Sequence, residues 1–149
     1  MNLRKAITKD GILLGLNGST KGDVIDELLD FMVETGKISD RKAAYKAVSE
    51  REKKMSTGMH HGIAIPHGKT DTVNSLVAVI GVKKEGIDFD ALDKELSRIF
   101  VMTVSPANRA GPHIQFLAEI SRLLNEEAVR DRIVAAESVE DIYNVVIES

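Results

Sequence analysis

The sequence predicts an α/β protein (α+β type) in which helices cover both faces of a central sheet. Residues 76–82 and 98–104 are apolar almost throughout and rich in β-branched side chains, which is typical of strands covered on both faces. Helical patterns come before and after this strand-rich centre, an order that favours a sheet between helices over a helical bundle. The 149 residues contain no internal repeat and no Pro/Ser-rich linker, so we expect one domain over residues 1–149.

The N-terminal region predicts a short strand followed by a helix. A glycine-flanked apolar run at 11–16 fits a first strand or edge segment. Thr20 and Asp23 then have the spacing of a capping box, and Gly36 is a natural residue to end the helix that follows. The apolar stripe of this helix consists of Val24, Ile25, Leu28, Leu29, Met32 and Val33.

A second helix, a loop and a short strand come next. Ser39 is expected to cap the helix, which should run to about Lys53. Its inward face is expected to consist of Ala43, Ala44, Ala47 and Val48. Residues 55–62 contain glycines and small side chains with little periodicity, which indicates a loop, and the apolar run at 63–65 predicts a strand that Pro66 stops.

The C-terminal half predicts a turn between the two central strands and then helices. Residues 84–86 (Lys-Glu-Gly) are turn-like, and Pro112 suits the first turn of a helix. That helix is expected to bury a stripe of Ile114, Leu117, Ala118, Ser121 and Leu124. Helix should continue over 128–136, and Ser138 with Asp141 forms a second capping box before a last helix.

Composition excludes several classes of protein. Twenty basic and 23 acidic residues give a net charge of −3, without the basic excess or basic stripe that is usual for nucleic-acid binding. No apolar run approaches the roughly 18 residues that a membrane span needs, and no secretory signal is recognisable. Cysteine is absent, so disulfides and thiolate metal ligands are excluded. We therefore expect a cytoplasmic protein that neither binds nucleic acid nor inserts into the membrane.

The histidines are the candidates for chemistry. Three of the four, His60, His61 and His67, fall within eight residues of one another, and His113 is distant in sequence. Three interpretations compete: solvated side chains of a polar loop, a metal site, and a histidine that carries a phosphoryl group. The metal site is the weaker functional interpretation, because no cysteine and no His-Glu-x-x-His motif is present.

The neighbours of His67 favour the phosphoryl carrier. Gly68 allows the backbone to approach a bulky anion, Ser56 and Thr57 offer hydroxyl and N–H donors, and Arg51 offers a guanidinium that suits phosphate oxygens. Phosphoryl transfer needs chiefly positioning and charge stabilisation, which such a set of residues can supply. No nucleotide-binding glycine motif is present, so we expect no cofactor and no metal.

These residues resemble a known signature. Arg51-Glu52, Ser56-Thr57-Gly58 and the segment 62–68 (Gly-Ile-Ala-Ile-Pro-His-Gly) look like the active-site motif of phosphotransferase system (PTS) enzyme IIA domains of type 2, the fructose/mannitol and nitrogen-regulatory family. The segment 113–117 resembles that family's second histidine, and the likeness covers nearly the whole chain. The resemblance implies a three-layer α-β-α sandwich with a mixed sheet of about four to five strands.

The resemblance also implies roles. His67 matches the histidine that accepts a phosphoryl group from phospho-HPr and passes it to a cysteine of an enzyme IIB component. Arg51 matches the arginine that binds the phosphoryl group, and His113 matches the second histidine beside the first. No IIB segment follows Ser149, so we expect the acceptor on a separate chain. The alternative is a nitrogen-regulatory IIA protein whose phosphorylation state controls binding to target proteins.

Two further expectations concern the loop before His67. His60 and His61 stand where many relatives have glycine followed by an acidic residue or asparagine, so any role of that side chain is in doubt. Met55, Met59 and Ile65 are expected to form an exposed apolar surface for the partners, because methionine adapts to more than one binding partner. The opposing interpretation is that all three are core residues.

Overall fold

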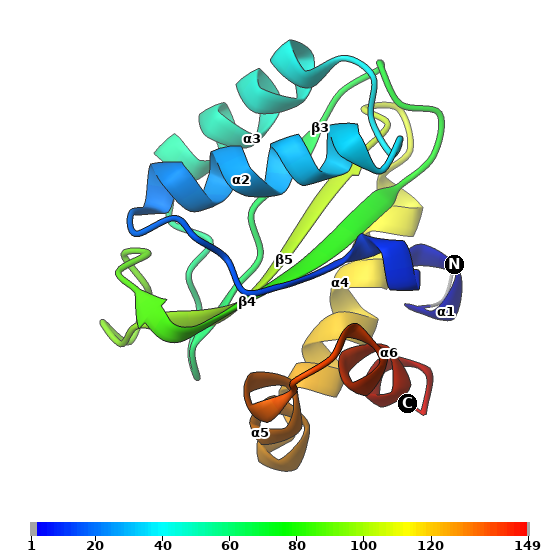
Figure 1. The fold of residues 1–149 in the computed structure, drawn as a ribbon. Coiled ribbons are helices and arrows are strands. Elements are labelled where there is room, and N and C mark those ends of the chain that lie inside the picture. The colour runs from blue at the N-terminus through cyan, green and yellow to red at the C-terminus, as the bar shows by residue number, and fades with distance from the viewer. Residues whose placement is uncertain (1–2, 149) are drawn as a thin grey trace.

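The computed structural model describes residues 3–148 of the chain (Figure 1). The elements are α1 (Leu3–Ala6), the 3-10 helix η1 (Lys9–Gly11), β1 (Ile12–Leu14), α2 (Lys21–Glu34), α3 (Arg41–Lys54), β2 (Ile63–Ala64), β3 (His67–Lys69), β4 (Val77–Ile87), β5 (Ser97–Ser105), α4 (Ala110–Leu124), α5 (Glu127–Ala135) and α6 (Val139–Ile147). None of the helices within residues 3–148 combines the length and the apolar character needed to cross a bilayer.

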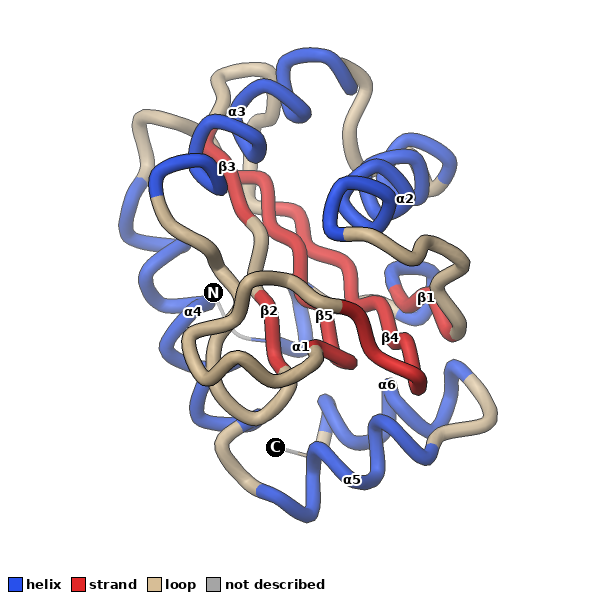
Figure 2. The backbone as a smooth tube through the Cα atoms, turned by 90° about the vertical axis from the view of Figure 1, so that its left-hand side faces the viewer, coloured by secondary structure: helices blue, strands red, loops and turns tan. Residues whose placement is uncertain are grey.

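The sheet is mixed, as expected. Within residues 3–148 it has five strands in the order β1-β4-β5-β2, and β3 also pairs with β5. The long strands β4 and β5 are antiparallel, while β1 is parallel to β4 and both β2 and β3 are parallel to β5. In Figure 2, β2 and β3 follow one another along the same side of β5.

Helices cover both faces of this sheet, which confirms the predicted three-layer α-β-α sandwich. In Figure 1, α2 and α3 lie on one side of the sheet, and α4, α5 and α6 lie on the other. Alternate residues of β5 belong to the two cores: Phe100 and Met102 pack with residues of α2 and α3, whereas Ile99 and Val101 pack with residues of α4, α5 and α6. The nearly continuous apolar character of the two central strands follows from this double coverage.

Two helix starts agree with the sequence and one differs by a residue. The hydroxyl of Thr20 accepts a hydrogen bond from the backbone N–H of Asp23, and Ser138 does the same for Asp141. The cap of α3 is Asp40 instead of the expected Ser39, because the carboxylate of Asp40 accepts from the N–H of Ala43. Both residue types suit a cap, so the sequence alone could not choose between these adjacent residues.

The expected turn at 84–86 is wrong. Strand β4 continues through these residues to Ile87, and the connection to β5 lies at 88–96. The register changes between Val82 and Ile87, where Gly86 adopts a φ of +78°. The turn-like residues therefore mark a bulge inside a long strand, which is a common place for a glycine with positive φ.

The expected stripe of α4 is also wrong. The buried face consists of His113, Phe116, Ile120, Leu123 and Leu124. Ile114, which the stripe placed inside, is 63% exposed. The expected and the observed stripes are rotated relative to each other around the helix axis and share Leu124. Helical periodicity alone could not choose between them. A smaller error of the same kind is Val33 in α2, which is exposed.

An interrupted edge strand positions His67. The predicted strand at 63–65 is β2, which ends at Ala64, and pairing with β5 resumes in β3, which was not predicted. Between them the carbonyl of Pro66 accepts a hydrogen bond from the N–H of Thr103 at 3.1 Å, so the chain stays on the sheet. Gly68 then lies against α3, because a Cβ there would be 2.7 Å from backbone atoms of Ala47 and Val48.

Candidate functional site

His67 is half-buried at the start of β3, and its ring orientation is fixed by its own loop. The Nδ1 atom lies 2.9 Å from the carbonyl oxygen of Ile65. A carbonyl only accepts hydrogen bonds, so this contact requires the proton on Nδ1 and leaves the lone pair on Nε2. His67 therefore presents a nucleophilic nitrogen away from the backbone.

His113 lies in the first turn of α4 and is brought against His67. The two ring centroids are 4.9 Å apart with an interplanar angle of 41°, which confirms the expectation that these imidazoles are in contact. His113 is 5% exposed, and its Nδ1 is buried without a hydrogen-bond partner among the described residues.

Both imidazoles are held in the neutral form. Burial is the largest cause that lowers the pKa of His67 below 6.5, and the positive charges of Arg51 and Lys69 act in the same direction. The bond to the Ile65 carbonyl and the charge of Glu52 act against it. Burial, followed by the charges of His67 and Lys69, lowers the pKa of His113 to about 4. A neutral His67 keeps its Nε2 lone pair available near pH 7.

Arg51 lies in the last turn of α3, the helix that packs on Gly68. Its Nη1 donates a 2.8 Å hydrogen bond to the carbonyl oxygen of Met55, just beyond the end of the helix. Its positive charge lowers the pKa of His67. The remaining guanidinium N–H groups are the obvious donors for an anion beside His67.

The loop after α3 is anchored by a residue to which sequence reasoning gave no role. Glu52 is 8% exposed, and its carboxylate accepts hydrogen bonds from the backbone N–H and the hydroxyl of Thr57. Lys21 of α2 contacts the same carboxylate at 2.9 Å. The pairing of Glu52 with a distant lysine has no signature in the sequence, although Glu52 does stand next to Arg51 in the motif.

Ser56 and Thr57, the expected phosphate-binding residues, are close to Arg51 in the chain but their hydroxyls point into the protein. The Ser56 hydroxyl donates to the carbonyl of Phe89 at 2.7 Å, and the Thr57 hydroxyl donates to Glu52 at 2.5 Å. The Thr57 carbonyl accepts from the N–H of Ile65, so the loop is tied to the segment that orients His67. A direct contact of either hydroxyl with a phosphoryl group requires these bonds to be exchanged.

The expected exposure of three apolar side chains before His67 is confirmed for two of them and wrong for the third, while their role in docking stays a prediction. Met55 is 63% exposed and Met59 is 39% exposed, whereas Ile65 is 4% exposed and belongs to the core between the sheet and α4. The side chain of Ile65 packs into this core while its carbonyl oxygen contacts Nδ1 of His67. Ile114 of α4, one residue after His113, is a further exposed apolar side chain.

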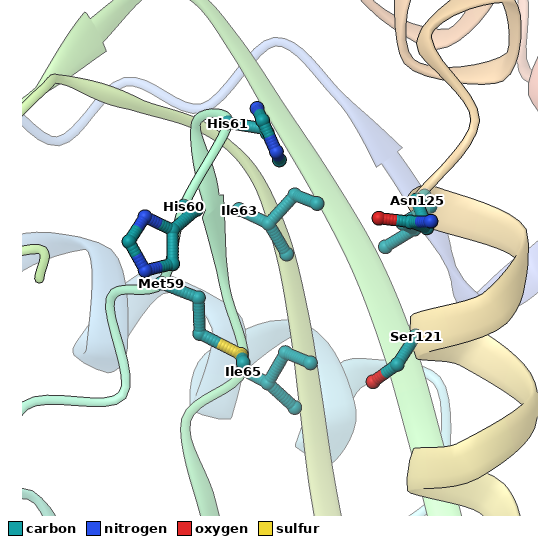
Figure 3. Close-up of a pocket in the computed structure, with 8 residues that line it drawn as sticks. Met59, His60, His61, Ile63, Ile65, Ser121 and Asn125 are labelled. Carbon is teal, nitrogen blue, oxygen red and sulfur yellow. The ribbon is translucent and has the colours of Figure 1, made fainter. Parts of the chain in front are cut away.

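His60 and His61 belong to a different place. They line a pocket of about 230 Å³ with Met59, Ile63, Ile65, Ser121, Leu124 and Asn125 (Figure 3). His61 has a φ of +64°, and its N–H donates to the carboxylate of Asp93 at 3.1 Å. Within residues 3–148, no three His, Cys, Asp or Glu side chains are grouped so that they could hold a metal ion.

Comparison with known proteins identifies the family. The family described as "Phosphoenolpyruvate-dependent sugar phosphotransferase system, EIIA 2" matches residues 5–149. The chain is 40% identical over 130 residues to the PTS system fructose-specific EIIA component of Haloferax volcanii, covering 87% of this chain and 84% of that relative. The chain therefore belongs to the PTS EIIA type 2 family.

Two further comparisons agree. The chain is 33% identical over 146 residues to the PTS system fructose-specific EIIABC component of Bacillus subtilis, covering 98% of this chain but only 23% of that longer relative. The crystal structure of the nitrogen regulatory protein IIA-Ntr from Neisseria meningitidis superimposes with a TM-score of 0.85, covering 97% of this chain and 98% of that one, at 21% identity. At 21% identity, the likeness to the Neisseria structure establishes the fold.

Proposed function

We propose that residues 1–149 form one PTS EIIA type 2 domain that carries a phosphoryl group on Nε2 of His67. The observation that carries this proposal is the bond between His67 Nδ1 and the Ile65 carbonyl, which leaves Nε2 as the free nucleophile. His113 is in ring contact with His67, and the charge of Arg51 acts on it. The donor in this proposal is phospho-HPr and the acceptor is a cysteine of an enzyme IIB component, both met in the cytoplasm.

In the first step the lone pair of His67 Nε2 attacks the phosphorus of phospho-HPr. A P–N bond forms to Nε2 while the P–N bond to the histidine of HPr breaks, and that histidine keeps the electron pair. The proton on His67 Nδ1 stays in its hydrogen bond to the Ile65 carbonyl, which supports the positive charge that develops on the ring. Arg51 stabilises the charge on the transferring oxygens.

In the second step a thiolate of the IIB component attacks the same phosphorus. A P–S bond forms, the P–N bond to Nε2 breaks, and His67 returns to its neutral Nδ1–H form. No net proton transfer to or from His67 is needed in either direction, because the Nδ1 proton is retained throughout. The same geometry therefore serves both the donor and the acceptor reaction.

The relatives support a sugar-transport acceptor. The Haloferax protein is named as a fructose-specific EIIA component, and the Bacillus protein carries the letters A, B and C in its fructose-specific name. We propose a IIB component of the fructose type as the acceptor. The structural likeness to the nitrogen regulatory protein, at 21% identity, bears on fold and not on role.

The test is phosphoryl transfer from phosphoenolpyruvate through enzyme I and HPr. Intact-protein mass spectrometry under alkaline conditions should show one added phosphate, and peptide mapping should place it on His67. His67→Ala should abolish the label, whereas His60→Ala, which changes an exposed histidine of the other pocket, should keep it. Full labelling of His67→Ala would refute the assignment, and transfer onward to purified fructose-type IIB would distinguish transport from regulation.

A further inference from the structure

A row of residues crosses the sheet directly beneath the first turn of α4. His67 of β3 is in register with Thr103 of β5, and Thr103 is in register with Ala78 of β4. Residues in register on neighbouring strands point to the same face, with Cβ atoms about 5 Å apart. Ala78 packs in the core cluster that contains Phe116 of α4, so this row faces α4.

Strand alternation gives the same result for each side chain. Gly68 faces α3, so its neighbour His67 faces the opposite side. Met102 and Val104 belong to the core of α2 and α3, so Thr103 between them faces α4. Thr103 therefore lies next to His67 on the sheet, under the helix turn that carries His113.

This part of the α4 side of the sheet holds two buried polar atoms without a partner. The hydroxyl of Thr103 is fully buried and makes no hydrogen bond among the described residues, and the same is true of Nδ1 of His113. Buried polar groups in native proteins nearly always pair, directly or through one ordered water. Each of these atoms is a chemically suitable partner for the other, since a hydroxyl can donate and a neutral imidazole nitrogen can accept.

We propose that Thr103 is a positioning residue whose hydroxyl is joined to Nδ1 of His113 by one ordered water, which accepts from the hydroxyl and donates to that nitrogen. This inference rests on the proposed phosphoryl transfer at His67. With Nδ1 of His113 accepting, its proton is on Nε2, and the Nε2–H group is a donor for the oxygens of a phosphoryl group on His67. The opposite tautomer would present a lone pair to those oxygens and repel them.

The register distinguishes Thr103 from the other unpartnered hydroxyls of β5. Ser105 faces α4 as well, but it is in register with Lys69 and not with His67. Ser97 lies on the same face at the opposite end of the strand, and its hydroxyl is also buried and without a partner among the described residues. Ser97 is thus a matched control, because its replacement removes an equivalent hydroxyl away from the histidines.

The tautomer can be read directly by nitrogen NMR of the imidazoles, a measurement that does not depend on phosphoryl transfer. In the unmodified protein we expect His113 to be protonated on Nε2, with Nδ1 showing the shift of a hydrogen-bond acceptor. Thr103→Val keeps the side-chain shape without the hydroxyl and should shift His113 toward the Nδ1–H tautomer or a mixture. Thr103→Ser should restore the original spectrum, and Ser97→Ala should leave it unchanged.

Transfer kinetics supply the second readout. Thr103→Val should still be phosphorylated on His67 but about 2- to 10-fold more slowly, the effect of one hydrogen bond on the transition state. Protonation of Nδ1 in the unmodified protein, or an unchanged tautomer in folded Thr103→Val, would overturn the proposal. If Thr103→Val does not fold, the unmodified protein and Thr103→Ser still decide through their spectra. Absence of any phosphorylation of the unmodified protein would instead count against the proposed function.

Discussion

The buried carboxylate of Glu52 binds Thr57 twice, accepting its backbone N–H at 2.7 Å and its hydroxyl at 2.5 Å. Lys21 pairs with the same carboxylate from α2. This arrangement links the last turn of α3, which carries Arg51, to the loop whose carbonyl at Thr57 accepts from the N–H of Ile65. Glu52 thus connects the helix turn that carries Arg51 to the segment that orients His67.

The first prediction follows from that connection. Glu52→Gln should lower the free energy of unfolding by about 1–3 kcal/mol, because a neutral amide replaces the charged acceptor that binds Thr57 and Lys21. Chemical denaturation of both proteins measures the difference. Glu50→Gln on the exposed side of the same helix is the control and should change stability little. Equal stability of Glu52→Gln and the unmodified protein would contradict the role assigned to this carboxylate.

The second prediction concerns the rate of transfer without Arg51. Arg51→Ala should slow phosphorylation of His67 by roughly 30- to 150-fold, equivalent to about 2–3 kcal/mol, since one charge-assisted contact to the transferring oxygens is lost. Rapid-quench measurement with phospho-HPr gives the rate. Arg41→Ala is the matched control at the other end of α3, where the arginine pairs with Asp26 and Asp30. Unchanged kinetics in a folded Arg51→Ala protein would remove Arg51 from the site.

The third prediction is a pKa change at His67. Burial lowers this pKa below 6.5, and the charge of Arg51 lowers it further. Arg51→Ala should therefore raise the pKa of His67 toward 6.5, and the acid limb of the transfer rate should move to higher pH with it, because only the neutral imidazole attacks. An NMR titration of His67 in both proteins measures this. A pKa that falls, or does not move, would be inconsistent with the proximity of these side chains.

Local sequence signals predicted the parts of this fold that depend on neighbours in the chain. The capping boxes at Thr20 and Ser138 were found because the cap and its acidic partner are three residues apart. The two central strands were found from their apolar, β-branched composition. His67 was singled out by its Pro-His-Gly setting, and its contact with His113, 46 residues away, was expected only through family resemblance.

The missed features depend on which surfaces meet in three dimensions. The buried face of α4 is set by the large side chains of Phe116 and Ile120 against the sheet, although the Ile114 stripe has the same period. Glu52 lies in a highly charged helix end, and its burial depends on Lys21 of another helix and on Thr57 of the following loop. Periodicity says that a helix has an apolar face, but the neighbouring layer decides which one.

The fourth prediction uses the close approach of β3 to α3. Gly68→Ala should cost about 1–3 kcal/mol of stability and slow transfer, since the new methyl group would overlap backbone atoms of α3 and displace His67. Gly22→Ala in α2, where a methyl group meets nothing within 4 Å, should instead be neutral or stabilising by about 0.4–1 kcal/mol. Thermal unfolding of the two variants gives the comparison. A Gly68→Ala protein as stable as Gly22→Ala would show that β3 and α3 do not pack closely at Gly68.

The fifth prediction is that His113 makes the protein less stable in acid. Its pKa is lowered from 6.5 to about 4 by burial and by the charges of His67 and Lys69. Between these two values the unfolded chain binds a proton that the folded protein does not. The stability due to neutral His113 is therefore fully present above pH 6.5 and is lost as the pH falls toward about 4, by an amount on the order of 3 kcal/mol.

The measurement is the free energy of unfolding between pH 7 and pH 4 for the unmodified protein and His113→Gln. The difference between the two curves should shrink or change sign as the pH falls, because glutamine has no proton to take up. The carboxylates of the chain affect the stability of both proteins equally, so they cancel in the difference. Phe116→Leu, one helical turn along the same buried face, serves as the control. It should lower stability by a similar amount at every pH, since no titrating group changes. Parallel curves for His113→Gln and the unmodified protein would mean that His113 is not buried as a neutral imidazole in the folded state.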